Sequence, residues 1–240
     1  MTPLPEMLTV PIEGGAVTSR IYPSMSGEAR AAVVLAHGAG ASQHHPFMTR
    51  CARGLASRDL DVMTFNFPYM ERMEEDRRAT GAARRRPPDR GPVLEACYRA
   101  VIGAVEHHVP SAGRGIVIGG KSMGGRIATQ VAAADPTLRL AGLVLLGYPL
   151  HPPGNPTRPR DAHLASIGRP VLFIQGSRDV FGTPGELGPV LARMQPRPAL
   201  SVVEGGDHSF VVPGAGTEGQ SIIETDVLET IARWILENSR

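Results

Sequence analysis

Short apolar runs alternate along this chain with longer stretches in which apolar residues recur every three or four positions. The short runs are rich in β-branched residues, which favours strands, whereas the longer stretches have the period of amphipathic helices. This alternation is typical of an α/β fold in which helices cover both faces of a mostly parallel sheet. We predict about eight strands, the first two forming a hairpin: Met7–Ile12, Ala16–Tyr22, Ala32–Ala36, Asp61–Phe65, Gly115–Gly119, Leu140–Gly147, Val171–Gln175 and Ala199–Val203.

The clearest helical period covers Pro92–His108, where Leu94, Val101 and Val105 fall on one stripe. Such a stripe is expected to pack on the sheet. Neither an internal repeat nor a linker interrupts the sequence, so we predict a single domain over residues 1–240. Further helices are predicted at Phe47–Ser57, Met123–Ala134 and Glu186–Met194, and from Thr217 toward the C-terminus.

One segment, Glu71–Arg90, departs from this pattern because it holds seven arginines among five acidic residues and no apolar stripe. Mixed charge runs are usually solvated surface, so we predict an exposed loop at about residues 69–91. A small lid over an active site, or an arginine clamp for an anionic substrate, is the functional alternative.

Composition narrows the class of protein. Apolar residues make up 42% of the chain and charged residues 20%, a balance that supports a sizeable core and argues against disorder. The formal charge of +2 is too small to indicate a nucleic-acid-binding surface. We therefore expect no nucleic-acid partner. We also expect a small-molecule substrate, and a monomer or homodimer.

Other features bear on location and cofactors. The two cysteines, Cys51 and Cys97, lie in predicted helices and resemble reduced core thiols. The first ten residues lack the features of a secretory signal, and no apolar run reaches the length of a membrane span. We expect a cytoplasmic protein outside the membrane. Adjacent histidine pairs point in different directions, so we expect no metal site.

The pattern G-x-S-x-G occurs at Gly120–Gly124, with Ser122 at its centre. The pattern alone is weak, but here an apolar strand precedes it and a predicted helix follows it. That context is the strand–turn–helix of a nucleophile elbow, in which small neighbours let the serine adopt a strained backbone. The elbow also aims the amide of Met123 at a developing oxyanion. Ser122 is therefore the predicted nucleophile.

The second half of an oxyanion hole is expected after the third strand. There the sequence reads His37-Gly38-Ala39-Gly40, and its small residues allow backbone amides to turn inward. We predict Ala39 as the amide donor, with Gly40 second; an ordinary glycine turn is the alternative. His37, and His151 after a later strand, are candidate pocket residues, although a plain loop histidine explains His151 equally well.

A serine hydroxyl needs a base and an acid that orients it, in the chain order Ser, acid, His on this kind of fold. His208 follows the last strand in a glycine-flanked loop and is the predicted base. Asp179 follows the preceding strand and is the predicted acid. Asp207 adjoins the histidine and is badly placed for its far nitrogen, and Asp161 lies in a helix-like segment.

A rival interpretation comes from Gly115–Ser122, which also fits the phosphate-binding pattern G-x-x-x-x-G-K-[ST]. In a phosphate-binding loop, the four middle positions form the loop itself. Here those positions are the apolar residues of a strand, and no later strand ends in a suitable magnesium-binding aspartate. Nucleotide binding is therefore a remote alternative.

Several blocks in order resemble α/β-hydrolases related to dienelactone hydrolase, especially a branch of little-characterised bacterial proteins with animal relatives. The resemblance implies an eight-stranded α/β-hydrolase fold, the triad above and no cofactor. Dienelactone hydrolase has a cysteine nucleophile where this chain has Ser122, so its lactone activity is not carried over. The blocks are His37–Gly40, Gly119–Arg126, Gly147–His151, Gln175–Gly182 and Gly206–Phe210.

The sequence thus predicts a serine hydrolase that cleaves a small acyl ester or thioester-like substrate through a covalent acyl-enzyme. Some animal relatives resemble scaffold subunits without activity. A non-catalytic interaction module on the same fold is therefore the main alternative.

Overall fold

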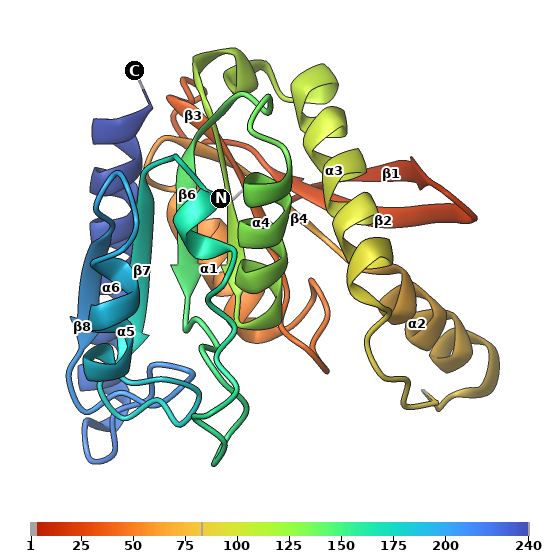
Figure 1. Ribbon diagram of the computed structural model, residues 1–240. Coiled ribbons are helices and arrows are strands. Elements are labelled where there is room, and N and C mark those ends of the chain that lie inside the picture. The colour runs from red at the N-terminus through yellow and green to blue at the C-terminus, as the bar shows by residue number, and fades with distance from the viewer. Residues whose placement is uncertain (1–3, 83, 240) are drawn as a thin grey trace.

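Eight strands form one sheet in the computed structural model, which describes residues 4–82 and 84–239 (Figure 1). The strand order is β1-β2-β4-β3-β5-β6-β7-β8. All neighbouring pairs from β4 to β8 are parallel, whereas β2 is antiparallel to both β1 and β4. The strands are β1 (Glu6–Ile12), β2 (Gly15–Tyr22), β3 (Ala31–Ala36), β4 (Leu60–Phe65), β5 (Ile116–Lys121), β6 (Leu140–Leu146), β7 (Val171–Gly176) and β8 (Ala199–Val203).

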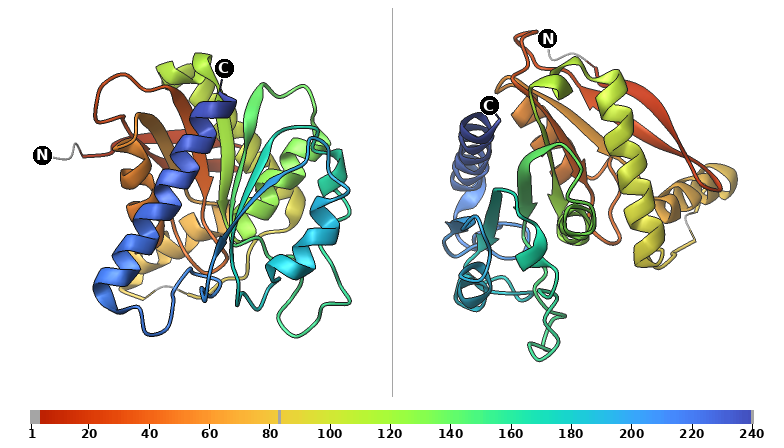
Figure 2. Two further views of the ribbon diagram at one scale, coloured as in Figure 1. Left: turned by 90° about the vertical axis from the view of Figure 1, so that its left-hand side faces the viewer. Right: turned by 45° about the horizontal axis from the view of Figure 1, so that its top comes forward.

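Helices cover both faces of this sheet, as Figures 1 and 2 show. One face carries α3, α4 and α5, and the other carries α1 and α6. The predicted mostly parallel, eight-stranded α/β fold is confirmed. The helices are α1 (Pro46–Ala56), α2 (Pro68–Thr80), α3 (Gly91–His108), α4 (Met123–Ala134), α5 (Pro184–Leu191) and α6 (Gly216–Asn238), with short 3-10 turns at Pro110–Arg114 and Leu164–Ser166.

The central strand β3 is apolar at every position because both of its faces are buried. In β3, Ala32 and Val34 face the core under α3 and α4, whereas Val33 and Leu35 face the core under α1 and α6. Successive side chains of a strand point to opposite faces, so a continuous apolar run serves both cores. This explains why the central strands were readable from sequence.

The charged segment differs from the prediction, because its first half is helix α2 and not a loop. The first turn is anchored: Tyr69 and Met70 are buried, and the Glu71 carboxylate accepts hydrogen bonds from the Thr18 amide (2.8 Å) and hydroxyl (2.5 Å). Gly81 ends the helix with φ of 76°. Residue 83, within the predicted loop, lies outside the described residues, as do residues 1–3 of the N-terminal segment, which lacks the features of a secretory signal.

Across the described residues, no helix is both long enough and apolar enough to cross a membrane.

Candidate active site

Ser122 lies at a sharp turn between β5, which ends at Lys121, and α4, which begins at Met123. Its φ and ψ are 52° and −116°, a conformation that a non-glycine residue adopts only under strain. The Ser122 amide donates to the Leu146 carbonyl at 3.0 Å, which ties the turn to β6. The surrounding structure therefore holds this strained serine in place.

The two glycines of the motif are required by close backbone packing. A Cβ on Gly120 would lie 2.2 Å from the Ala36 carbonyl oxygen, and one on Gly124 would lie 2.3 Å from the same atom. Only glycine lets β5 and α4 approach β3 so closely. The elbow predicted from the sequence pattern is thus present as a strand–turn–helix.

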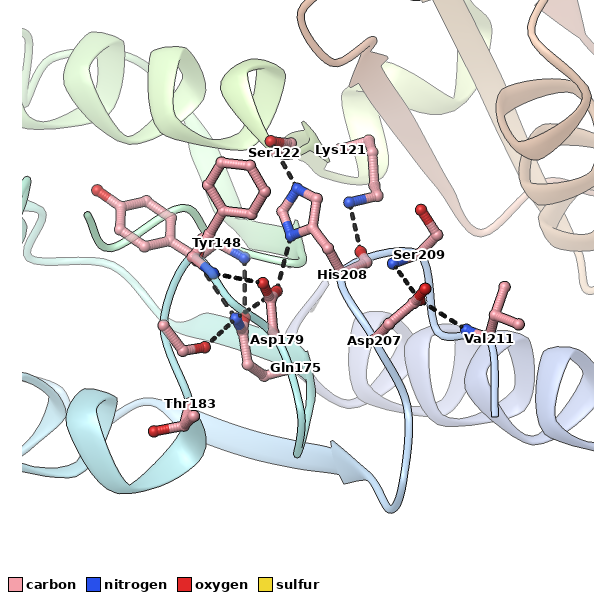
Figure 3. Close-up of polar contacts among 12 residues, drawn as sticks. Lys121, Ser122, Tyr148, Gln175, Asp179, Thr183, Asp207, His208, Ser209 and Val211 are labelled. Atoms are coloured by element: carbon pink, nitrogen blue, oxygen red, sulfur yellow. Dashed lines mark hydrogen bonds and ion pairs between the residues drawn. The ribbon is translucent and has the colours of Figure 1, made fainter. Parts of the chain in front are cut away.

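The side chains of Ser122, His208 and Asp179 form a continuous hydrogen-bonded chain (Figure 3). His208 Nε2 lies 2.9 Å from Ser122 Oγ, and His208 Nδ1 lies 2.7 Å from Asp179 Oδ2. A carboxylate only accepts, so Nδ1 carries the proton and Nε2 is free to accept from the serine hydroxyl. This arrangement suits a serine that loses its proton to a base.

Three strands bring these residues together from distant parts of the chain. Ser122 follows β5, Asp179 follows β7, and His208 lies in the loop after β8. These strands are parallel, so their carboxyl ends meet at one edge of the sheet, the lower edge in Figure 1. The two rival acids lie elsewhere: Asp207 accepts from the amides of Ser209 and Val211, and Asp161 pairs with Arg193.

The Asp179 carboxylate is 1% exposed, and each of its oxygens is bonded. Oδ1 accepts from the Phe181 amide at 2.9 Å, and Oδ2 accepts from Gln175 Nε2 at 2.8 Å as well as from His208. Gln175 is fully buried and also bonds the Tyr148 amide and the Gly182 carbonyl. Gln175, which sequence reasoning missed, therefore fixes the carboxylate.

Lys121 is a second residue that sequence reasoning missed. Its Nζ donates to the His208 carbonyl oxygen at 2.7 Å (Figure 3) and lies about 6 Å from the ring centres of Phe47 and Phe210, at 5.9 and 5.8 Å. Burial lowers the pKa of Lys121 to about 8, against an opposing effect of the Asp179 and Asp207 charges. The lysine thereby ties the histidine loop to the elbow.

Ser122 opens onto a cavity of about 710 Å³. His208 and the predicted amide donors Met123 and Ala39 also line this cavity, whereas Gly40 does not. A Cβ on Gly38 would lie 3.5 Å from Ser122 Cβ, so the loop of Ala39 packs directly against the elbow. The remaining wall is formed by Gly38, Ala41, His45, Phe47, Met48, Arg50, Pro88, Asp89, Gly91, Leu94, Lys121, Arg126, Pro149, Arg160, Phe181, Ser209, Val211 and Glu224.

The prediction that His37 and His151 line the pocket is corrected, because neither residue lines the cavity. His37 is fully buried, bonds the Gly38 carbonyl through Nδ1 at 2.9 Å, and accepts from the Phe67 amide through Nε2 at 3.1 Å. Burial lowers its pKa to about 4. His151 is buried between the Pro152 carbonyl and Glu186. Both rings therefore fix loops instead of facing a ligand.

The remote alternative, a phosphate-binding loop at Gly115–Ser122, is contradicted by the structure. Residues 116–121 are the extended strand β5, so they cannot wrap around a phosphate. For metals, the described part of the chain holds no group of three or more potential side-chain ligands.

The sequence family described as an alpha/beta hydrolase domain matches residues 29–236 of this chain. The chain belongs to this alpha/beta hydrolase domain family. A dienelactone hydrolase from Anabaena variabilis has a similar structure, with a TM-score of 0.75, 20% identity and full coverage of both chains. This agrees with the resemblance drawn from the motif blocks.

Two further solved structures share the fold of this α/β hydrolase. An α/β serine hydrolase without a lid from Xanthomonas campestris has a TM-score of 0.67 and 20% identity, over 98% of this chain and 96% of that one. The esterase domain of a Rhodothermus marinus protein has a TM-score of 0.70 and 14% identity, over 99% and 100% of the two chains.

Proposed function

We propose that this α/β hydrolase is a serine esterase that cleaves small acyl esters or thioester-like substrates through a covalent acyl-enzyme. The observation that carries the proposal is the unbroken chain Ser122–His208–Asp179, with both contacts below 3 Å, at the wall of an open cavity. A nucleophile within reach of its base, and a base oriented by a third group, define this chemistry.

In the proposed reaction, Ser122 Oγ bonds to the acyl carbon while its proton passes to His208 Nε2. The carbonyl oxygen becomes an oxyanion, and the Met123 and Ala39 amides stabilise it; Gly40 is the second choice of donor. The imidazolium then gives its proton to the leaving oxygen as that bond breaks. Asp179 keeps the imidazole in the required tautomer.

The acyl-enzyme is released by the same groups in reverse. A water molecule gives a proton to His208 Nε2 and attacks the acyl carbon, and the proton then returns to Ser122 Oγ as the acid leaves. We propose that this cycle needs no cofactor or metal. We also propose that residues 1–240 act as one domain, as a monomer or homodimer in the cytoplasm.

The interaction-module alternative loses support in this geometry. A scaffold on this fold has no need to preserve a serine–histidine contact of 2.9 Å, a strained elbow and an open cavity beside them. Among the described residues of the segment at 69–91, Pro88, Asp89 and Gly91 are the ones that border the cavity. A lid function for this segment is a secondary proposal.

Initial rates on p-nitrophenyl esters of increasing acyl length test the proposed function. We expect turnover by the wild type and a loss of about 10⁴-fold or more in kcat for Ser122→Ala and His208→Ala. The exposed Ser221 of α6 supplies a matched control, since Ser221→Ala removes a hydroxyl that does not line the cavity. Equal rates for Ser122→Ala and Ser221→Ala would reject the proposal.

A further inference from the structure

Two arginines on the cavity wall have no acidic partner. Arg126 and Arg160 are half-buried and line the same cavity as Ser122. Among the described residues, no carboxylate oxygen lies within 4 Å of either guanidinium. The Arg126 guanidinium bonds only a neutral group, Gln130 Oε1, at 3.2 Å. Half-buried charges without a counter-ion are costly unless a ligand supplies it.

The backbone holds both arginines in place. Arg126 lies one helical turn beyond the nucleophile, and its amide donates to the Ser122 carbonyl at 3.0 Å. Arg160 lies in the loop after β6, where its amide donates to the Leu150 carbonyl and its carbonyl accepts from the Tyr148 hydroxyl, both at 2.7 Å. The two side chains thus start from fixed positions.

The two guanidiniums are also close enough to affect each other. Burial, together with the neighbouring charge of Arg160, lowers the pKa of Arg126, against an opposing effect of Tyr148 and Glu95. Two like charges brought together at a cavity wall attract an anion, which relieves their repulsion, and the planar guanidinium fork matches a carboxylate.

The acidic groups of the described cavity wall are already paired. The Asp89 carboxylate pairs with Arg72 and accepts from the Tyr69 amide, and Glu224 pairs with Arg50 at 3.1 Å. Lys121 donates to a backbone carbonyl. The uncompensated charge beside the nucleophile is therefore positive, and no acidic group of the wall is free to offset it.

We propose that Arg126 and Arg160 form a carboxylate-binding subsite, so that the preferred substrate is an ester with an anionic acyl group. This inference rests on the proposed esterase function and assigns its substrate class.

The position of Arg126 indicates which half of the ester carries the anion. Ser122 immediately precedes α4, and Arg126 lies in the first turn of that helix, where its amide donates to the Ser122 carbonyl at 3.0 Å. The acyl group is bonded to Ser122 and held at the start of α4, whereas the leaving group departs toward His208, whose ring lies 4.3 Å from that of Phe181 between ring centres. Arg126 is therefore placed to bind the acyl half, a few bonds from the scissile carbonyl.

The test compares two esters with the same acyl length and leaving group: p-nitrophenyl hydrogen adipate, which carries a carboxylate, and neutral p-nitrophenyl hexanoate. We expect the wild type to prefer adipate by at least about 10-fold in kcat/KM. Arg126→Gln and Arg160→Gln should each reduce the adipate-to-hexanoate ratio by about 10- to 100-fold, mainly through KM.

Arg158 supplies the control, because it is exposed on the same loop and does not line the cavity. Arg158→Gln should keep the wild-type ratio. Circular dichroism checks that each variant is folded. Hexanoate cleaved as well as adipate by the wild type, or a ratio unchanged in both arginine variants, would overturn the subsite while leaving the esterase function intact.

Calorimetry with monomethyl adipate and the Ser122→Ala variant separates the subsite from catalysis. Binding that weakens when Arg126→Gln is added supports the subsite even if every ester proves inert, a result that would reject only the proposed function. No binding of monomethyl adipate, or binding that is unaffected by the arginine substitutions, contradicts the subsite.

Discussion

Replacing Lys121 with methionine should change the pH dependence of stability in a direction that the structure fixes. Burial lowers the pKa of Lys121 from its ordinary 10.5 to about 8 in the folded protein. Between these two values the unfolded chain binds the proton and the folded chain does not. Stability linked to this group therefore rises with pH across that window.

The size of the effect follows from the two pKa values of Lys121, about 8 folded and 10.5 unfolded. Each unit of difference between the two pKa values corresponds to roughly 1.4 kcal/mol. The charged lysine therefore lowers the free energy of unfolding by about 3 kcal/mol at pH 7. Most of this penalty, about 2 to 3 kcal/mol, disappears by pH 10. Methionine has a similar length and no charge, so the Lys121→Met variant lacks this contribution.

Urea denaturation of both proteins at pH 7 and pH 10 measures the effect. We expect the stability of wild type relative to Lys121→Met to rise by about 2 to 3 kcal/mol between these pH values, because groups common to both proteins cancel. The variant also loses the hydrogen bond from Lys121 to the His208 carbonyl. That loss applies at both pH values, so it cancels from the change in relative stability between them. A difference in stability that stays constant with pH would refute the reasoning.

Three further variants and one control test other parts of the structure. Asp179→Asn should lower kcat on p-nitrophenyl acetate by about 10⁴-fold, because the amide no longer holds the histidine tautomer; a loss below about tenfold would contradict this. Gly124→Ala should destabilise the fold by about 3 kcal/mol or more in urea, since its Cβ would lie 2.3 Å from the Ala36 carbonyl. Gly188→Ala on α5, with open space around its Cβ, should be neutral or slightly stabilising in the same assay. Burial lowers the pKa of His37 to about 4, so the unfolded chain binds its proton first as pH falls below 6.5. Wild type should therefore lose about 2 kcal/mol more stability than His37→Gln between pH 7 and pH 4.5, and equal losses would argue against it.

The fold was largely readable from sequence because its central strands are buried on both faces and its main helices have one apolar stripe. The exception is α2, whose helix-forming residues after Met70 are nearly all charged or polar, so that no stripe marks the period. Its first turn is held by tertiary contacts with β2, through Glu71 and Thr18. No local pattern in the sequence carries that information.

Some residues of the candidate site could be predicted from the sequence and others could not. Ser122, Asp179 and His208 could be predicted because each follows an apolar strand at a position that strand order makes meaningful. Gln175 could not, because a buried glutamine at the end of a strand looks like any polar strand terminus until its partners are known. The lack of an acidic partner for Arg126 among the described residues could not be predicted either, because it is a property of the assembled cavity.

Labelling with a fluorophosphonate probe, followed by mass spectrometry of the labelled peptide, tests the nucleophile assignment most directly. We predict one adduct per chain, located on Ser122, at full yield in Ser221→Ala and absent in Ser122→Ala. Labelling of Ser122→Ala to the same extent as wild type, or an adduct on another residue, would contradict the account.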